Sequence, residues 1–367
     1  MRKEIRDRQA EIIKEFAENN IKIEKRIDEM WRECAEFGIL AALVPEKVGG
    51  MAKNYSEILQ TAYMVGKYFK DNGITFAINN SMIVASYVLP MYGDKKLISQ
   101  LYPDLLNGKL IAAYAITESQ SGSDVFNMKT NVVRRKDHLI LNGAKTYISN
   151  GPIADIFVVI AQNEENTYTA LLVQKNDKGV EIGKPIEKMG LEHCPMSEIY
   201  FTHCILPKSR IIGEYNWGQI ISNMTLDWER ALSFASHLGT MDRIINQCLH
   251  YANARQQFGR RIGDYQLIAE KLVKMKIDLE TGKLWLDKIG KMKDRGKKTY
   301  LETSIFKYLI GESYANCCLE ALQIHGAYGY SKESGFEKEV RDALAAKIYS
   351  GTSEIQIDII SQLMGVR

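Results

Sequence analysis

Long hydrophobic runs are absent from this sequence. Its longest apolar segments, such as residues 110–116, are far shorter than the roughly 20 residues that a membrane-spanning helix needs. Residues 1–16 alternate charged and apolar positions at helical spacing and contain no apolar segment of the signal-peptide type. We therefore expect no membrane-spanning segment and a cytoplasmic location.

Metal-ligand and disulfide spacings are absent as well. No CxxC pair occurs among the cysteines, which are Cys34, Cys194, Cys204, Cys248, Cys317 and Cys318. The adjacent pair at 317 and 318 lies in a helical pattern, which suits neither a metal site nor a disulfide framework. We predict six small core residues and no metal site.

A strong net charge is also absent. The formal charge is only +3 at pH 7, which is too small to favour a nucleic-acid partner. One segment, residues 288–298, gathers six Lys and Arg. It is predicted to be a solvated helix end and turn, with a docking patch as the alternative.

The chain has the composition of a folded globular protein, with 46% hydrophobic and 25% charged residues. Its periodicity changes twice along the sequence, and we place the domain boundaries at 1–109, 110–215 and 216–367. Helical spacing in the first part covers 21–43, 55–69 and 95–106. Strand patterns in the second cover 110–117, 139–149, 156–162, 168–174 and 199–206. Helical patterns return over 220–258, 265–294, 300–325 and a last stretch ending near 363. The order predicts an α+β protein with an N-terminal helical domain, a middle β domain and a C-terminal four-helix bundle.

Several common catalytic motifs are missing. The sequence contains no Walker loop, GxGxxG, HExxH or GxSxG. Nucleotide-sandwich, zinc-protease and serine-hydrolase functions therefore have no support.

Five other segments do occur, in one order and at one spacing. They are YAITESQSGSD at 114–124, YISNG at 147–151, RQQFG at 255–259, QIHGAYG at 323–329 and YSGTSEIQ at 349–356. Together they resemble the acyl-CoA dehydrogenase family, and the resemblance extends from about residue 30 to the C-terminus. It implies the fold described above, an FAD cofactor, and α,β-dehydrogenation of a thioester-bound acyl or aminoacyl group.

The resemblance also assigns the cofactor residues. The strand ending at Thr117 and its Ser- and Gly-containing loop offer hydroxyls, N–H groups and a close approach to a pyrophosphate. Residues implied to hold FAD within one subunit are Tyr114, Ile116, Thr117, Gly122, Ser123, Tyr147, Ser149, Thr352 and Glu354. Residues implied to reach the FAD of a neighbouring subunit are Arg255, Phe258, Gln323 and Gly326. A dimer or tetramer follows from this shared site.

The last motif departs from the common family pattern. Many relatives carry the catalytic glutamate where this chain has Ser350, and a serine without an activating base cannot remove an α-proton. A minority, including isovaleryl-CoA dehydrogenase, carries the base on the first C-terminal helix at the position of Glu229. Asp227 lies about 200° away around that helix, so only one of the two can face the substrate. We predict that Glu229 is the base and that Asp227 faces polar surroundings.

The resemblance then implies a mechanism. The ribityl hydroxyl of FAD and the backbone N–H of Ser350 bind the thioester carbonyl, Glu229 removes the α-proton, and a hydride passes to the flavin. Desolvation is expected to raise the pKa of Glu229 from about 4.3 towards roughly 6 to 7. Expected substrate contacts are Arg230, Ser233 and Gly351. Reoxidation needs an acceptor such as an electron-transfer flavoprotein or O2.

The substrate and the reaction variant remain open at this point. Segments 72–80, 227–230 and 349–353 are similar to the branch that acts on aminoacyl or acyl groups held by a carrier protein in biosynthetic pathways. The alternative is a short or branched acyl-CoA, as for isovaleryl-CoA dehydrogenase. Two further classes are a flavin oxidase or hydroxylase on the same fold and a catalytically silent flavoprotein, and a carboxylate at 229 speaks against the silent one.

Overall fold

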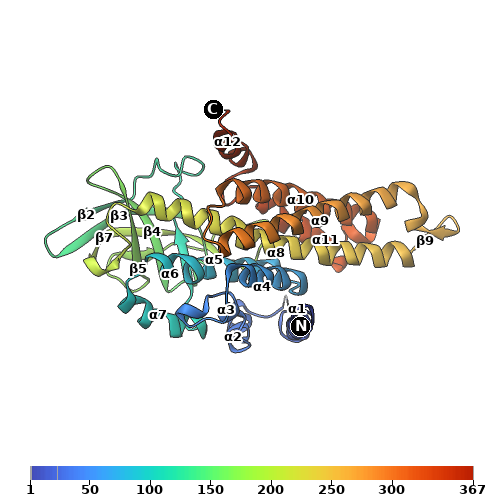
Figure 1. Ribbon diagram of the computed structural model, residues 1–367, viewed down its shortest axis with the longest axis horizontal. Coiled ribbons are helices and arrows are strands. Elements are labelled where there is room, and N and C mark those ends of the chain that lie inside the picture. The colour runs from blue at the N-terminus through green and yellow to red at the C-terminus, as the bar shows by residue number, and fades with distance from the viewer. Residues whose placement is uncertain (1, 23, 367) are drawn as a thin grey trace.

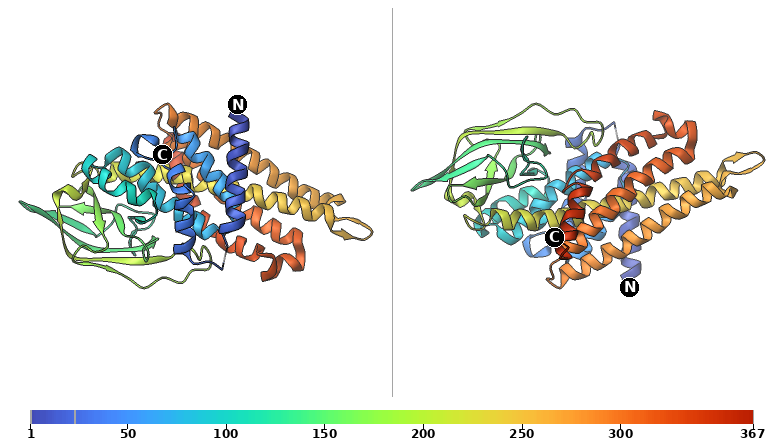
Figure 2. Two further views of the ribbon diagram at one scale, coloured as in Figure 1. Left: turned by 90° about the horizontal axis from the view of Figure 1, so that it is seen from below. Right: turned by 90° about the horizontal axis from the view of Figure 1, so that it is seen from above.

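The computed structural model describes residues 2–22 and 24–366, which form a helical N-terminal part, a β-sheet and a set of long C-terminal helices (Figure 1). The sheet lies at one end of the molecule, and a small hairpin projects from the other end (Figure 2). The long helices connect the two ends. The order of helices, strands and helices is the one that the sequence pattern predicted.

The N-terminal part is built from short helices around one buried helical segment. Its helices are α1 (Arg2–Asn20), α2 (Ile27–Glu36), α3 (Ile39–Ala42), η1 (Glu46–Val48), α4 (Tyr55–Tyr68), α5 (Asn72–Ile83), η2 (Val84–Val88), α6 (Leu89–Tyr92) and α7 (Lys95–Leu106). Side-chain caps start α4 and α7, where Asn54 and Asp94 accept hydrogen bonds from first-turn N–H groups. The segment 72–92 contains no uninterrupted apolar run of membrane-spanning length, because asparagine, serine and threonine residues divide it, but by its length and mean hydropathy it could cross a membrane. In the structure 89% of its apolar window is buried inside the protein. It is the core of this part.

The middle part is an eight-stranded sheet of order β6-β7-β3-β2-β4-β5-β8, with β1 paired to β4. Its strands are β1 (Ala112–Ala115), β2 (Asn131–Arg134), β3 (His138–Ser149), β4 (Ile156–Asn163), β5 (Tyr168–Gln174), β6 (Val180–Ile182), β7 (Met196–Pro207) and β8 (Ile211–Ile212). Strand β4 is buried along nearly its whole length because both of its faces are covered, which matches its continuous apolar sequence. The short strands β2, β6 and β8 have too few residues to give a clear alternation, and the sequence pattern missed them.

The C-terminal part contains the longest helices. Its elements are α8 (Gly218–Ala254), β9 (Gln256–Gln257), β10 (Arg260–Arg261), η4 (Ile262–Asp264), α9 (Gln266–Asp294), α10 (Tyr300–Tyr330), η5 (Lys332–Ser334), α11 (Phe336–Leu344), η6 (Ala345–Lys347) and α12 (Ser353–Leu363); η3 (Lys208–Arg210) precedes β8. Helices α8 to α11 pack side by side as the predicted bundle (Figure 1).

Two predicted helix boundaries in this part are wrong. The helix predicted over 220–258 ends at Ala254, because the chain turns there into the β9–β10 hairpin, with Phe258 in a left-handed conformation (φ 52°). The last helical stretch is split into α11 and α12 by residues 345–352, where Ser350 and Gly351 adopt positive φ. That interruption carries the last family motif, so it shapes the site.

Helix α4 of the N-terminal part crosses α8, and the backbones of the two helices are in direct contact at the crossing. A Cβ on Gly66 of α4 would lie 1.9 Å from the carbonyl oxygen of Ser236, and one on Gly239 of α8 would lie 2.0 Å from that of Tyr63. Only glycine permits this approach, since any side chain would collide with backbone. The contact fixes α8 two to three turns beyond Glu229.

All six cysteines are free and buried, as predicted. The basic segment 288–298 forms the end of α9 and the following turn, also as predicted, except that Lys293 is buried in an ion pair with Asp227.

Candidate active site

The site is centred on Glu229, about three turns into α8. Its side chain is only 9% exposed, and the hydroxyl of Ser350 donates a hydrogen bond of 2.6 Å to its Oε1. Burial raises the pKa of Glu229, while the Ser350 hydrogen bond and the charge of Arg230 oppose that shift. A buried carboxyl group with a raised pKa is a stronger base than a solvent-exposed one, which suits it to accept a proton from a substrate.

The segment that presents Ser350 is anchored from behind. The residue lies at φ 57°, and its carbonyl accepts hydrogen bonds of 3.1 Å from Arg230 Nε and of 3.1 Å from Gln356 Nε2. A Cβ at Gly351 would lie 2.6 Å from the Gln356 amide nitrogen, so the turn needs glycine there. Arg230 therefore holds the turn that carries Ser350, and the substrate contacts of Arg230 and Gly351 stay predictions.

Asp227 lies on the other side of α8, as helical geometry predicted. It forms a buried ion pair of 2.6 Å with Lys293 and accepts hydrogen bonds from the hydroxyls of Thr299 and Thr303. All its described contacts come from α9, the following turn and α10. The carboxylate of Asp227 thus has an ion pair and two hydroxyl donors, whereas the carboxylate of Glu229 has one hydroxyl donor among the described residues.

Three buried hydroxyls lie on β1 and α8. They belong to Tyr114, Ser222 and Ser233. Burial raises the pKa of Tyr114, interactions with the Ser222 and Thr225 hydroxyls lower it, and the charge of Glu229 raises it. Tyr114 and Ser222 therefore lie close enough to interact with each other, which leaves Ser233 as the hydroxyl of this group without a partner among the described residues.

A group of packed rings precedes the Ser350 turn. The Tyr349 hydroxyl is hydrogen-bonded to His237 Nε2, and its ring packs against Phe76 at 4.4 Å between centroids. Burial lowers the pKa of His237 to about 3 and raises that of Tyr349, so both groups are neutral at pH 7.

The predicted flavin residues lie along the ends of β1 and β3. Thr146 N–H donates to the Thr117 carbonyl at 2.9 Å and joins the two strands there. Tyr147 is 60% exposed and held at φ 55°, so its ring is available to a planar ligand. A Cβ placed on Gly122 would meet no atom within 4 Å, and Ser123 beside it is exposed. Exposed hydroxyls, an open glycine and a free aromatic plane at one edge fit an FAD ring and its pyrophosphate.

Sequence reasoning missed the pair that supports this edge. Lys145 is fully buried and donates to the Ile116 carbonyl at 2.9 Å and to Glu118 Oε1 at 2.8 Å. Burial by itself would raise the pKa of Glu118. The charge of Lys145 and the hydrogen bonds to the carboxylate have the opposite effect and lower this pKa to about 2. A lysine at an inward position of a predicted strand was the available signal, because a buried lysine needs a partner.

The remaining predicted residues fall into two groups. Thr352 caps α12 by accepting the Ile355 N–H, and Glu354 is exposed in the first turn of that helix. Arg255, Phe258, Gln323 and Gly326 are all exposed, and Phe258 is 94% exposed. At 1.5 Å per helical residue, Arg255 is roughly 39 Å from Glu229 along α8. These last four residues cannot complete the site around Glu229 of their own chain.

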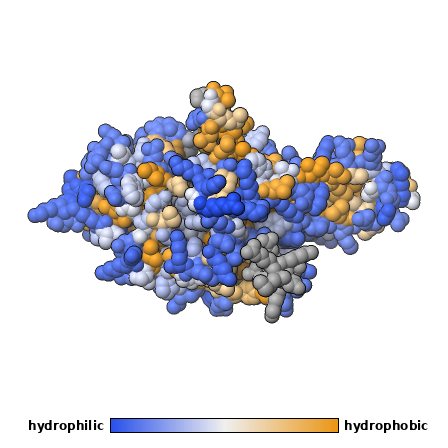
Figure 3. Space-filling model, in the orientation of Figure 1, coloured by the Kyte–Doolittle hydropathy of each residue, from blue (hydrophilic) through white to orange (hydrophobic). Residues whose placement is uncertain are grey.

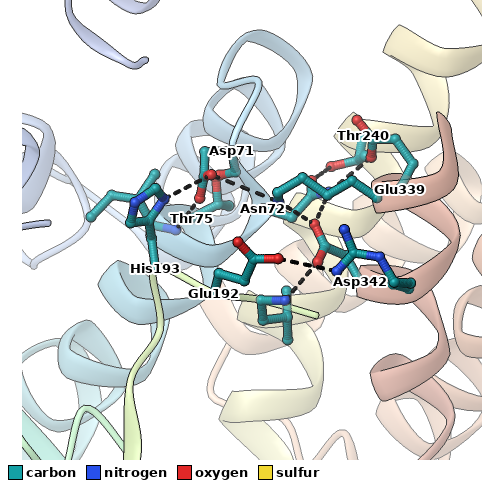
Figure 4. A network of polar contacts seen from close by, with 12 residues as sticks. Asp71, Asn72, Thr75, Glu192, His193, Thr240, Glu339 and Asp342 are labelled. Carbon is teal, nitrogen blue, oxygen red and sulfur yellow. Dashed lines mark hydrogen bonds and ion pairs between the residues drawn. The ribbon is translucent and has the colours of Figure 1, made fainter. Parts of the chain in front are cut away.

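A second missed feature is a buried polar network behind the site (Figure 4). It joins Asp71 at the start of α5, His193 in the segment between β6 and β7, and Asp342 of α11. His193 Nδ1 lies 2.9 Å from Asp71 Oδ2, and Asp342 accepts the Leu191 N–H at 2.6 Å. The partners are more than 100 residues apart in sequence, so no local pattern could reveal them.

Fold and site together define a thioester dehydrogenase of the flavin type, with a buried carboxylate and a separate edge for a planar cofactor. Three family models cover nearly all of the chain. They are the acyl-CoA dehydrogenase N-terminal domain at 1–109, the middle domain at 113–204 and the C-terminal domain at 216–365. The chain therefore belongs to the acyl-CoA dehydrogenase family, and it is an FAD-dependent oxidoreductase, as the motifs predicted.

Individual relatives are similar over almost the whole length. An L-prolyl-[peptidyl-carrier protein] dehydrogenase from Serratia sp. is 33% identical over 348 residues, which cover 92% of this chain and 89% of the relative. The crystal structure of the prolyl acyl carrier protein oxidase AnaB matches with a TM-score of 0.94 and 34% identity, covering 98% of both chains. The structure of PigA with FAD and proline matches with a TM-score of 0.94 and 30% identity, covering 99% of this chain and 98% of that one.

Proposed function

We propose that this protein oxidises a prolyl or similar aminoacyl group, held as a thioester on a carrier protein, to its α,β-unsaturated form. The proposal is carried by the buried Glu229, which is paired with a serine where many family members have the base. It is supported by the substrates for which the prolyl-carrier-protein relatives are named. We also propose a cytoplasmic biosynthetic role, because a carrier-bound amino acid is a biosynthetic intermediate.

The residues of this chain divide the work as follows. Glu229 takes the α-proton, and burial raises its pKa above the ordinary value for a glutamate, which makes it a stronger base. The turn at Ser350 places its backbone N–H for the thioester carbonyl, and Arg230 and Gln356 hold that turn in place. The residues at the ends of β1 and β3 hold FAD, which supplies the acceptor for the β-hydride when bound.

The carrier protein would dock at the turn between α9 and α10. Lys297 and Lys298 lie in this turn and are exposed, and neither forms an ion pair in the part of the chain that the structure describes. The cavity of about 160 Å³ beside them is lined by Asp227 and Lys293, so it lies on the side of α8 away from Glu229 and is not the path of the acyl group. The two lysines would instead attract the acidic surface of a small carrier.

The test compares the oxidation of the same prolyl group when it is bound to a carrier protein and when it is bound to CoA. Prolyl-carrier protein should be oxidised with a much higher kcat/KM than prolyl-CoA, because remote binding energy positions the reacting end. Lys297→Glu/Lys298→Glu should raise KM for the carrier-bound substrate about 10-fold or more with kcat retained. Arg135→Glu/Lys136→Glu, an equal charge change on the exposed β2–β3 turn, is the matched control.

Two outcomes would redirect the proposal. Equal kcat/KM on carrier and CoA would assign the enzyme to CoA metabolism, with a short or branched acyl-CoA as the substrate. Rapid reoxidation of the reduced flavin by O2 would make it an oxidase, the activity named for AnaB, while slow reoxidation would favour an electron-transfer flavoprotein.

We further propose that the protein is a dimer or tetramer. The exposed hairpin at Phe258 and the exposed apolar residues of α9 and α12, including Leu267, Leu284 and Ile357, support a second copy as their partner. Hydrophobic surface over α12 and part of the long helices is visible in Figure 3. Arg255 would then reach a neighbour's cofactor.

A further inference from the structure

We propose that the Ser350 hydroxyl is a positioning group for the catalytic base, which fixes one carboxylate oxygen of Glu229 and favours its ionised form. This inference rests on the proposed role of Glu229 as the base. It assigns a function to the serine side chain itself, in addition to the backbone of its turn.

The geometry of the pair is specific. Ser350 Oγ donates to Glu229 Oε1 at 2.6 Å, and both side chains are buried. This is the one hydrogen bond to the Glu229 carboxylate among the described residues, so Oε2 is left for the substrate. A short O–H···O⁻ bond of this kind is charge-assisted and is stronger than one between neutral groups.

The serine cannot easily turn away from the carboxylate. Its backbone is held at φ 57°, and two donors, Arg230 and Gln356, fix its carbonyl from the opposite side. A non-glycine residue in this conformation carries strain and persists only where its surroundings hold it. The turn therefore maintains the hydroxyl at a constant position relative to α8.

Other groups around Glu229 cannot replace this bond. Burial and, to a smaller extent, the charge of Glu229 raise the pKa of Tyr114 in β1 and of Tyr349 before the turn, so both phenols stay neutral, and neither is hydrogen-bonded to the carboxylate. Arg230 of α8 contributes positive charge, but its guanidinium is hydrogen-bonded to the Ser350 carbonyl and to Ser304. Burial thus disfavours the ionised form of Glu229, and the Ser350 hydroxyl is the group that stabilises that form by a direct hydrogen bond.

A serine at 350 also explains how the base can lie on α8. A glutamate at 350 would bring a second carboxylate to the same buried space, and two close carboxylates cannot both ionise at neutral pH. The hydroxyl avoids this conflict and supplies a donor instead. We infer that the base position and the serine form one functional unit.

The test is the pH dependence of anaerobic flavin bleaching by substrate in the holoenzyme. Ser350→Gly removes the hydroxyl and suits the positive φ, so folding and FAD content should be retained. The midpoint of the rate profile should rise by about one to two pH units, the usual effect of losing a charge-assisted hydrogen bond. The rate should approach that of the wild type at high pH, where Glu229 ionises without help.

Ser313→Ala is the matched control, because it removes a buried hydroxyl of α10 that lowers the pKa of another carboxyl group, that of Asp278, and is not bonded to Glu229. Its midpoint should equal that of the wild type. An infrared carboxyl band present in Ser350→Gly and absent from Ser350→Gly/Glu229→Gln would identify the protonated group directly. If the midpoint of Ser350→Gly equals that of the wild type, the inference about the serine is wrong. If the wild-type enzyme is not bleached by the substrate at any pH, the proposed function is wrong instead.

Discussion

Glu229 and Asp227 are two residues apart on α8, yet the fold gives them opposite tasks. Asp227 is paired with Lys293 and two threonine hydroxyls, so its charge is fully compensated. Glu229 is buried with one serine hydroxyl, so its charge is costly and its proton affinity is raised. The helix determines that they diverge, and the elements packed on each side determine what each one meets.

Replacing Glu229 tests its role as the base. Glu229→Gln keeps the shape and the hydrogen bond to Ser350 but removes basicity. FAD content and folding should persist, while the rate of flavin bleaching by substrate should fall roughly 10²- to 10⁴-fold. Stopped-flow absorbance under anaerobic conditions measures this, and a near wild-type rate would show that another group is the base.

Replacing Asp227 should lower the stability of the fold and leave the rate of flavin bleaching nearly unchanged. Asp227→Asn leaves the buried Lys293 without a counter-charge, which typically costs about 3–5 kcal/mol of stability. Thermal unfolding should show a lower Tm, while the bleaching rate of the folded enzyme changes little. Asp287→Asn, which breaks the exposed pair with Lys291, is the control and should change Tm only slightly. Similar Tm values for the two variants would contradict this prediction.

At the scale of elements, α11 links the site to the β domain. Asp342 accepts the Leu191 N–H and pairs with Lys338, while Glu339 pairs with Arg243 of α8 at 2.8 Å. Figure 4 shows Glu339 and Asp342 in one network with Asp71 and His193. The network thus fixes α11, which ends six residues before Ser350, while Arg230 and Gln356 hold the turn itself.

The His193–Asp71 contact should make stability depend on pH. The hydrogen bond to Asp71 raises the pKa of His193, so the folded state binds its proton more tightly than the unfolded state. The stabilisation is fully present below the unfolded pKa of about 6.5 and is lost as the pH rises through the higher folded pKa. His193→Gln should therefore cost more free energy of unfolding at about pH 5.5 than at about pH 8.5.

Urea titrations at the two pH values measure this difference. His250→Gln, at an exposed position on α8 without an ion pair in the described chain, is the control. A His193→Gln penalty that is equal at both pH values, or larger at the higher one, would show that the imidazolium does not contribute.

At the scale of the whole molecule, the predicted cofactor residues of one chain lie in two separate places. The sheet and the Ser350 turn hold one set of predicted cofactor residues, while the hairpin that follows Arg255 is at the far end of the molecule (Figures 1 and 2). Phe258 in this hairpin is 94% exposed, so it contributes little to the core of its own chain and is free for the subunit contact that we propose.

Arg255→Ala should weaken FAD retention in the assembled protein. The arginine makes no ion pair among the described residues, so its loss should leave Tm of the FAD-free protein unchanged. The FAD to protein ratio after gel filtration should fall, and so should the mass of the complex if FAD bridges subunits. Full FAD occupancy in a stable monomer would disprove a shared site.

The sequence by itself determined the order of helical and β parts, the family and the candidate base, because each depends on local periodicity or on contiguous motifs. Strand β5 and helix α7 have the predicted bounds, since their patterns are bounded by turn residues. Even the divergence of Glu229 and Asp227 followed from helical geometry alone.

Only the tertiary structure decided what those residues contact. The Ser350 hydroxyl on Glu229, Lys293 on Asp227, Lys145 on Glu118 and His193 on Asp71 each join segments 27 or more residues apart. The break between α11 and α12 is likewise fixed by Arg230 and Gln356, which anchor the Ser350 turn. Such contacts depend on how distant elements pack. The free energy of burying each charge is determined by the partners that this packing provides and not by the local sequence.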